Sequence, residues 1–512
     1  MKPKTALIDS TNSSLTGFPL LCAFVGIWQR CRPAFAQDRT HQTGLDLAFG
    51  LLTAFGRRTI SRGICARALQ HFDWSRFYRF FSKDVWFPVA LTHQLLIETG
   101  RHLKAPWPLV IGVDDTTAPK TGKKIPASGY FYDSKSPPFA RSFRWALRFI
   151  TMCALITPHG PLAAATGILL KFKLAPTIQK PKKNAPAHQQ EQYKQFVKHW
   201  SITTQLVEQL HLLRVQMDAI TSLAKRLLVV VADGSYTNKT VIRNLPKRCV
   251  FIGRTRKDIE LYEPAKSAPG SRGRKKKYGN RLPTPDEMRK DDTIPHERGQ
   301  IFACGKWHTL RYKTVGPVLW KSAGCDTGLR LIIIAPLHYR LSKLSKLLYR
   351  RPAYLLVTDP DYPVHLAIQH YFHRWEIEVN HRDAKNNFGV GKAQVRHPRS
   401  VARQFSFAAL LYSMLALAGL DAYGPTRTAN YTPRPKWRND PRPRPSASDL
   451  ATQIRIELWR REAGEQLIEF PVDPVLAPNA PKYVENAQAW LAQTVPKGLP
   501  LTAWSAILHA DA

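Results

Sequence analysis

Two short runs of consecutive apolar residues, each followed at once by carboxylates, constrain the fold of this 512-residue chain most strongly. Leu109 to Val113 precedes Asp114-Asp115-Thr116-Thr117, and Leu227 to Ala232 precedes Asp233. An uninterrupted apolar run of this length is typical of a strand that is buried on both faces. An amphipathic helix is expected between them, from about Gln190 to Leu213. Strands that alternate with helices predict an α/β fold.

The carboxylates after these runs are candidates for a shared site. In an open α/β sheet, functional groups gather at the carboxyl ends of the strands, so Asp115 and Asp233 are expected to lie close together. Asp114 competes with Asp115 for this role, because neighbours on a strand point to opposite sides. Each aspartate alone is weak evidence, since aspartate commonly ends strands and caps turns.

A third candidate acid lies in a segment that reads as a helix. At about 100° per helical residue, Tyr371, Arg374, Glu378 and Lys385 share one narrow stripe, whereas Glu376 falls on another face. One acid beside a phenol and two cations suits a surface that binds a metal through the acid and phosphates through its neighbours. A solvated helix face with charge pairs four residues apart is the alternative.

These acids predict a metal centre. Asp115, Asp233 and Glu378 are enough to hold a pair of Mg²⁺ or Mn²⁺ ions about 4 Å apart. Oxygen ligands without cysteine or clustered histidine favour these ions over zinc. The seven cysteines form no CxxC pair, so neither a zinc site nor a disulfide framework is indicated, and a reducing cytoplasm fits best.

The charge of the chain indicates its partner. Lys and Arg number 76 and Asp and Glu 37, which gives a formal net charge of +39 on a chain with 44% hydrophobic residues, as in a folded protein. Such a surface concentrates polyanions, DNA first among them. The basic residues that are candidates for phosphate contacts, each of which is alternatively part of a solvated loop, are Lys171, Lys173, Lys180, Lys182, Lys183, Arg272, Arg274, Lys275, Lys276, Lys277 and the range 434–444.

A membrane protein is not expected. The longest uncharged run, Gln404 to Leu420, falls short of the ~20 apolar residues of a spanning helix and reads as a buried helix. The N-terminus imitates a signal peptide through its apolar stretch from Leu15 to Trp28, but Asp9 before this stretch and Arg30 after it disagree with that reading. The expected location is the cytoplasm.

The first hundred residues read as helical, with apolar residues at helical spacing from Leu45 to Phe55 and a second helix from Ile64. Between them lies a basic turn, Gly56 to Gly63. Two short helices around such a turn suit a helix-turn-helix that docks on DNA. An ordinary helical bundle with a solvated basic loop is the alternative, because the sequence signal of the motif is weak.

The chain resembles the DDE transposases of bacterial insertion sequences, in the branch with a Tyr-x2-Arg-x3-Glu-x6-Lys signature. Tyr371, Arg374, Glu378 and Lys385 match that signature completely in spacing. The first catalytic aspartate of the family precedes a Thr pair, as Asp115 does, and its second follows a hydrophobic strand. The resemblance covers about residues 105 to 420 and implies a ribonuclease H-like core with a β-rich insertion between the second and third acids.

The resemblance also implies roles for residues. Asp115, Asp233 and Glu378 would bind metal and cut at transposon ends, while Tyr371, Arg374 and Lys385 would grip DNA phosphates near a flipped base. Tyr354 stands where the family has a Trp that stacks on this base. Trp307 and Trp320 are alternatives for the stacking role, and each also reads as a packing residue.

The expected organisation follows from these assignments. The expected regions are a helical N-terminal DNA-binding region (1–105), the first part of the catalytic core (106–240), a β-rich insertion with a basic loop (241–352), the last part of the core (353–422), a Pro/Arg-rich linker (423–447) and a helical C-terminal region (448–512).

The expected function is Mg²⁺-dependent cleavage and strand transfer at the terminal inverted repeats of an insertion sequence. The partner is double-stranded DNA, both transposon ends and target, and the resemblance implies a homodimer in the synaptic complex. The resemblance also implies a location in the bacterial cytoplasm, in association with the nucleoid. The alternatives are a non-catalytic or domesticated repressor that binds DNA, and a ribonuclease H-like nuclease without transposition.

Overall fold

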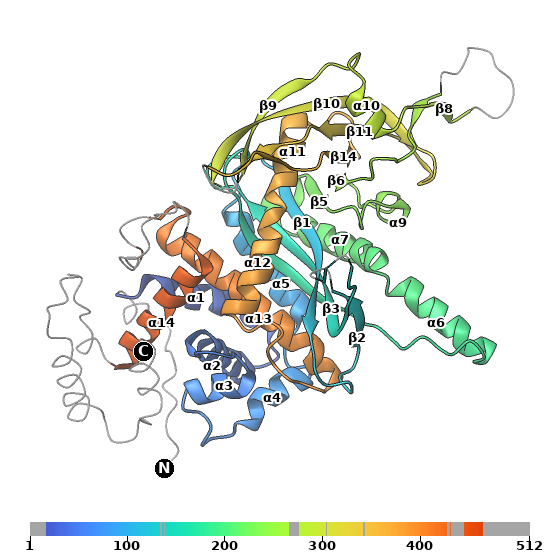
Figure 1. Ribbon diagram of the computed structural model, residues 1–512. Coiled ribbons are helices and arrows are strands. Elements are labelled where there is room, and N and C mark those ends of the chain that lie inside the picture. The colour runs from blue at the N-terminus through green and yellow to red at the C-terminus, as the bar shows by residue number, and fades with distance from the viewer. Residues whose placement is uncertain are drawn as a thin grey trace. The chain divides into compact units, whose positions relative to one another are not determined.

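The computed structural model describes residues 17–133, 136–137, 139–265, 276–303, 305–340, 344–427, 431 and 445–463 (Figure 1). The chain divides into two compact units that each combine segments distant in sequence. The first unit consists of Met1–Phe87, Lys385–Val395 and Met414–Ala512, and the second of Pro88–Ala384 and Arg396–Ser413.

The first unit is helical where it is described, as the sequence predicted for its N-terminal part. Its helices are α1 (Pro19–Arg30), η2 (Arg32–Ala34), α2 (Asp38–Thr53), α3 (Ile60–Ala66), α4 (Ser75–Ser82) and α14 (Ala447–Ala463). Apolar side chains such as Phe24, Trp28 and Phe77 are almost completely buried and form its core.

The turn of the expected helix-turn-helix lies between α2 and α3. These helices approach closely because Gly50 and Gly63 face each other, and a Cβ on Gly50 would overlap the Gly63 carbonyl. Arg57 and Arg58 of the turn donate hydrogen bonds to backbone carbonyls of Lys392 and Asn386 in the same unit. Two cations of the turn therefore have intramolecular partners, and the DNA-docking role stays a prediction.

The second unit is a mixed α/β structure around a large mixed sheet, which confirms the predicted fold class at that level. Its strands are β1 (Leu109–Pro119), β2 (Gly129–Tyr132), β3 (Phe143–Ile156), β4 (Thr166–Ala175), β5 (Leu228–Ala232), β6 (Cys249–Arg254), β7 (Tyr262–Pro264), β8 (Tyr278–Arg281), β9 (Glu297–Ala303), β10 (Lys306–Trp320), β11 (Cys325–Ile334), β12 (His338–Tyr339), β13 (Leu348–Tyr349) and β14 (Ala353–Val357). Its helices are α5 (Pro88–Arg101), α6 (Ala187–His199), α7 (Ile202–Asp218), α8 (Thr221–Ala224), α9 (Lys239–Ile242), α10 (Pro285–Lys290), α11 (Val364–His373), most of α12 (Trp375–Asn387) and the first part of α13 (Pro398–Tyr423).

The two apolar runs form neighbouring parallel strands, β1 and β5, and β6 lies parallel to β5 on its other side. On the far side of β1, strands β3 and β4 continue the sheet in antiparallel fashion. The residues of β5 are fully buried, as expected of a strand covered on both faces. The expected helix from Gln190 to Leu213 is present as two helices, α6 and α7.

The β-rich segment between β6 and β14 extends the same sheet. β14 pairs antiparallel with β6, and β11 and β10 follow in order. The sequence reading placed β6 inside the insertion, whereas its hydrogen bonds place it beside β5. A short apolar run such as Cys249 to Ile252 does not reveal its pairing partner, which the sheet decides.

Helices cover both faces of the strands around β3. Side chains alternate along a strand, so Phe149 and Thr151 share one face and Ile150 the other. Phe149 stacks on Phe405 of α13, with ring centroids 4.5 Å apart, and Thr151 contacts His381 of α12. On the opposite face, Lys173 of β4 pairs with Glu208 of α7 at 3.7 Å.

Within the described part of the chain, one helix, α13, is long and apolar enough to cross a membrane by length and composition. Its most apolar window is 78% buried inside the protein. A core helix passes the same test, in agreement with the prediction of a buried helix for Gln404 to Leu420.

Candidate active site

The candidate site begins at β1, where Asp114 and Asp115 lie in mid-strand. The apolar run was expected to end the strand, but β1 continues to Pro119 because β3 supplies hydrogen-bonding partners as far as Ala146. Its parallel pairing with β5 stops at Val113. The two carboxylates therefore lie where the chain after β5 turns away from the sheet.

Asp114 points to the face that α12 covers. Its cross-strand partner is Thr151, whose hydroxyl contacts His381 Nε2 at 2.8 Å. Arg374 Nη1 lies 3.4 Å from Asp114 Oδ2, and Arg374 Nη2 donates to Glu378 Oε1 at 3.0 Å. One guanidinium thus links two of the candidate acids.

The charged form of Asp114 is disfavoured in this place. Burial raises the pKa of Asp114 to about 7, against the opposing effect of Arg374. The charges of Asp233 and Asp115 contribute to this rise. A buried carboxyl group that lies next to other acids and has a pKa this far above its ordinary value marks a candidate functional site. A cation bound there would favour the charged form of the carboxylate.

Asp115 points to the other face of the sheet and has different partners. Arg148 Nε donates to Asp115 Oδ2 at 2.7 Å, and the Tyr236 hydroxyl donates to Oδ1 at 3.3 Å. Burial, followed by the nearby Asp115 charge, raises the pKa of Tyr236. The structure therefore brings Asp114, the competitor of Asp115 in the sequence reading, to Arg374 and Glu378.

Asp233 follows β5 directly and stabilises the turn after it. Its Oδ1 accepts hydrogen bonds from the backbone nitrogen and the hydroxyl of Ser235, at 3.0 and 2.6 Å. Burial raises the pKa of both Asp114 and Tyr371, and the charge of Asp233 acts in the same direction on each. Asp233 is therefore near the same centre, as the rule for carboxyl ends of strands predicted.

The signature segment forms two helices where one was expected. α11 ends at His373 and α12 begins at Trp375, while Arg374 between them keeps a right-handed helical backbone. The guanidinium of Arg374 lies 6.0 Å from the centroid of the Tyr371 ring. Tyr371, Arg374 and Glu378 are thus neighbours, as their spacing predicted. Lys385 lies seven residues beyond Glu378 on α12.

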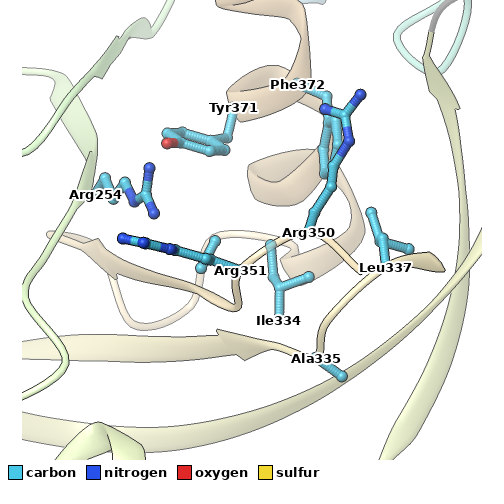
Figure 2. Close-up of a pocket in the computed structure, with 9 residues that line it drawn as sticks. Arg254, Ile334, Ala335, Leu337, Arg350, Arg351, Tyr371 and Phe372 are labelled. Atoms are coloured by element: carbon cyan, nitrogen blue, oxygen red, sulfur yellow. The ribbon is translucent and has the colours of Figure 1, made fainter. Parts of the chain in front are cut away.

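A basic pocket of about 340 Å³ opens beside Tyr371 (Figure 2). Its lining consists of Arg254, Ile334, Ala335, Leu337, Arg350, Arg351, Ala353, Tyr371 and Phe372. In Figure 2, Arg254 and Arg351 lie on the side of the Tyr371 ring, and Arg350 lies beside Phe372. The lining contains three guanidinium groups and no carboxylate, so the pocket suits a phosphate group.

The sequence reading missed these three arginines. Arg254 is the last residue of β6, so the rule that located Asp233 at the end of β5 would have found it once β6 was assigned to the same sheet. Arg350 and Arg351 form a basic pair just before β14, and no pattern in the sequence connects them with Tyr371.

Tyr354 lies in a different environment from the one its predicted stacking role requires. Its side chain is only 4% exposed, and its hydroxyl donates to Asp286 Oδ1 at 2.7 Å. A ring packed in this way has no free face for a base. Trp307, an alternative, is 52% exposed on β10, where it makes an edge contact with Phe302.

The basic-loop candidates are described only in part. Lys276 and Lys277 are exposed just before β8, whereas Arg272, Arg274, Lys275 and the range 434–444 lie outside the described residues. Lys171 is buried on β4, and burial lowers its pKa to about 8. Lys173 contacts Trp200 and Glu208, so neither lysine is a simple solvated loop residue.

The fit of the site to a metal ion depends on donor chemistry. Asp114, Asp233 and Glu378 offer the hard oxygen atoms that Mg²⁺ and Mn²⁺ prefer. Among the residues that the structure describes, no three His, Cys, Asp or Glu side chains are grouped closely enough to hold a metal. Instead, the Arg374 guanidinium contacts both Asp114 and Glu378, and a cation would have to replace it there.

A comparison with known families assigns the chain. The family model described as DDE superfamily endonuclease matches residues 31–321, more than half of the sequence. The match includes β1 and β5 with their aspartates and ends before the signature segment of α11 and α12. No curated protein matches the sequence. The chain therefore belongs to the DDE superfamily of endonucleases, a family of nuclease and transposase type.

Proposed function

We propose that this protein is a transposase that cuts DNA at the inverted repeats of its own insertion sequence and transfers the cut strand. Family membership supports an endonuclease that acts on DNA. The observation that carries the proposal is the linked group Asp114–Arg374–Glu378 with the basic pocket beside Tyr371. Acids that suit a metal and arginines that suit phosphates are adjacent, as phosphodiester cleavage requires.

The strands β4, β3, β1, β5 and β6 are the ribonuclease H-like core in this proposal, and the strands from β7 to β13 are its insertion. The signature of Tyr371, Arg374, Glu378 and Lys385 supports the insertion-sequence branch. The neighbouring positions of its first three residues add to that support. The protein would act in the bacterial cytoplasm.

The metal ligands in this proposal are Asp114, Asp233 and Glu378. A bound Mg²⁺ or Mn²⁺ pair would activate a water or a DNA 3′-hydroxyl and stabilise the leaving oxygen. Arg254, Arg350 and Arg351 would hold the phosphates of the strand. Arg374, which contacts both Asp114 and Glu378, would move to a phosphate when these acids take up a cation.

The test is cleavage of a supercoiled plasmid that carries the ends of the element, in Mg²⁺. Glu378→Gln should abolish cleavage and retain end binding, because it removes a negatively charged ligand and keeps the size of the side chain. Glu376→Gln is the matched control, since this acid lies on another face of the same helix, and it should still cut. Cleavage by Glu378→Gln, or equal loss in both variants, would refute the assignment.

Binding of the ends without cleavage by the wild-type protein in Mg²⁺ or Mn²⁺ would favour the non-catalytic repressor. Cleavage of plasmids that lack the ends would favour a general nuclease.

A further inference from the structure

The hairpin of β2 and β3 carries an unusual row of aromatic side chains, which we call the aromatic ladder: Tyr130, Tyr132, Phe143 and Trp145. Tyr130, Tyr132 and Phe143 are 63%, 50% and 66% exposed. The rings form two cross-strand pairs, Tyr130 with Trp145 at 4.9 Å and Tyr132 with Phe143 at 6.2 Å between centroids. Exposed aromatic groups of this size mark an interaction surface.

The register of the strands places the aromatic ladder on the same face as Asp114. Cross-strand partners point to one side, and the pairing of β3 with β1 and β2 is regular from Thr151 to Phe143. Thr151, the partner of Asp114, therefore shares a face with Phe149, Trp145 and Phe143.

Phe405 of α13 covers Phe149, and Leu147, the next residue on this face, is buried as well. The exposed side chains of the face lie at its far end, where Phe143, Tyr130 and Tyr132 are found. Six residues of strand separate Thr151 from Trp145, a distance of about 20 Å. The ladder thus begins about 20 Å from the acids, along the sheet face that leads away from them.

The positive charge of the segment that contains the aromatic ladder indicates which kind of partner it binds. Between Asp115 and Glu191 the chain has twelve Lys and Arg residues and one acid, Asp133. Asp133 forms an ion pair with Arg144. Lys123, Lys124 and Arg141, close in sequence to the hairpin strands, are exposed. A second copy of this chain would bring the same positive charge to the surface, whereas a nucleic acid brings the opposite charge.

We propose that the aromatic ladder binds the unpaired bases of a DNA strand by stacking, about 20 Å along the sheet from the candidate acids. This inference rests on the proposed function and specifies the form of DNA that the protein holds on this part of its surface. Residues two apart on a strand are about 6.7 Å from each other, about twice the 3.4 Å spacing of successive nucleotides in one DNA strand. Stacking of this kind is independent of base sequence.

The experiment measures the affinity of the full-length protein for a fluorescent 20-mer of thymidine and for a duplex of equal length, in EDTA. The variant Tyr130→Leu/Tyr132→Leu/Phe143→Leu keeps apolar side chains and removes the rings. It should bind the single strand at least tenfold more weakly and the duplex less than threefold more weakly. Tyr130→Phe/Tyr132→Phe should bind the single strand as the wild type does, because the rings remain.

Phe131→Leu is the matched control, because Phe131 lies on the same strand and points to the opposite face. It should leave single-strand affinity unchanged. Thermal unfolding of each variant verifies that the hairpin still folds. If the triple variant unfolds earlier, the single variant Phe143→Leu, at the start of β3, provides the same comparison.

Equal single-strand binding by the triple variant and the wild type would overturn the inference, as would a wild type that does not bind the single strand. Loss of self-association in the triple variant, with unchanged DNA binding, would identify a second copy as the partner and also overturn it. The cleavage test of Glu378→Gln is independent of these measurements, so failure of the aromatic ladder leaves the proposed function intact.

Discussion

Asp114 and Asp115 show how adjacent residues of one type acquire different roles. The pleat of β1 directs Asp114 to Arg374 and Glu378, and Asp115 to Arg148 and Tyr236. The sequence contains both aspartates in equivalent contexts, and only the position of α12 distinguishes them. The first ligand proposed for the metal therefore differs by one residue from the sequence prediction.

Matched substitutions can distinguish the roles of Asp114 and Asp115. Asp114→Asn should lower the cleavage rate at least about 100-fold, because it removes a metal ligand. Asp115→Asn should retain more than a tenth of the activity and lower the unfolding temperature, because Arg148 loses its carboxylate. Cleavage rates and thermal unfolding check both expectations, and a greater loss of activity in Asp115→Asn would reverse the assignment.

The side chains of the candidate site that the sequence did not predict are three arginines. Arg254, Arg350 and Arg351 come from the end of β6 and from the segment before β14, about a hundred residues apart in sequence. Tyr354 was predicted to stack on a base because of its position in the family pattern. In the structure its hydroxyl donates a hydrogen bond to Asp286, and its ring is buried in the protein interior. Sequence position does not specify the exposure of a side chain.

The position of α12 depends on a close approach to β4. A Cβ on Gly167 would overlap the Asn380 amide of α12, which itself contacts Cys153 Sγ and accepts a hydrogen bond from Tyr412. At Gly112, on β1, an added Cβ would make an ordinary contact, since it would lie 3.6 Å from its nearest neighbour. Of these two glycines, Gly167 is therefore the one whose lack of a side chain allows α12 to pack against β4.

Gly167→Ala should therefore destabilise the protein by about 1–3 kcal/mol, because overpacking displaces α12. It should also slow cleavage, since α12 carries Glu378. Gly112→Ala, in which the added methyl group makes an ordinary contact, should change the free energy of unfolding by less than about 0.5 kcal/mol. Denaturant titration and plasmid cleavage measure both effects, and equal destabilisation of the two variants would contradict this role of Gly167.

The net charge of +39 belongs to the molecule as a whole and should appear in the salt dependence of DNA binding. If about ten basic residues contact phosphates, the affinity for duplex DNA should fall with a log–log slope of about −9. Arg351→Ala should make the slope less steep by about 0.9, whereas Arg256→Ala, whose guanidinium is paired with Asp258, should leave it unchanged. Titrations at several salt concentrations measure this, and a slope near zero would contradict DNA binding.

The sequence by itself determined the α/β class, the buried strands before the aspartates and the adjacency of Tyr371, Arg374 and Glu378. These features are local: apolar runs define strands, and helical spacing defines which side chains are neighbours. Tertiary structure decided which of two adjacent aspartates meets Arg374, that β6 joins the core strands, and which arginines surround Tyr371. These features depend on pairing and packing between segments that are distant in sequence. The side to which a strand residue points, and whether it is exposed, can be known only when the neighbouring strands and helices are in place.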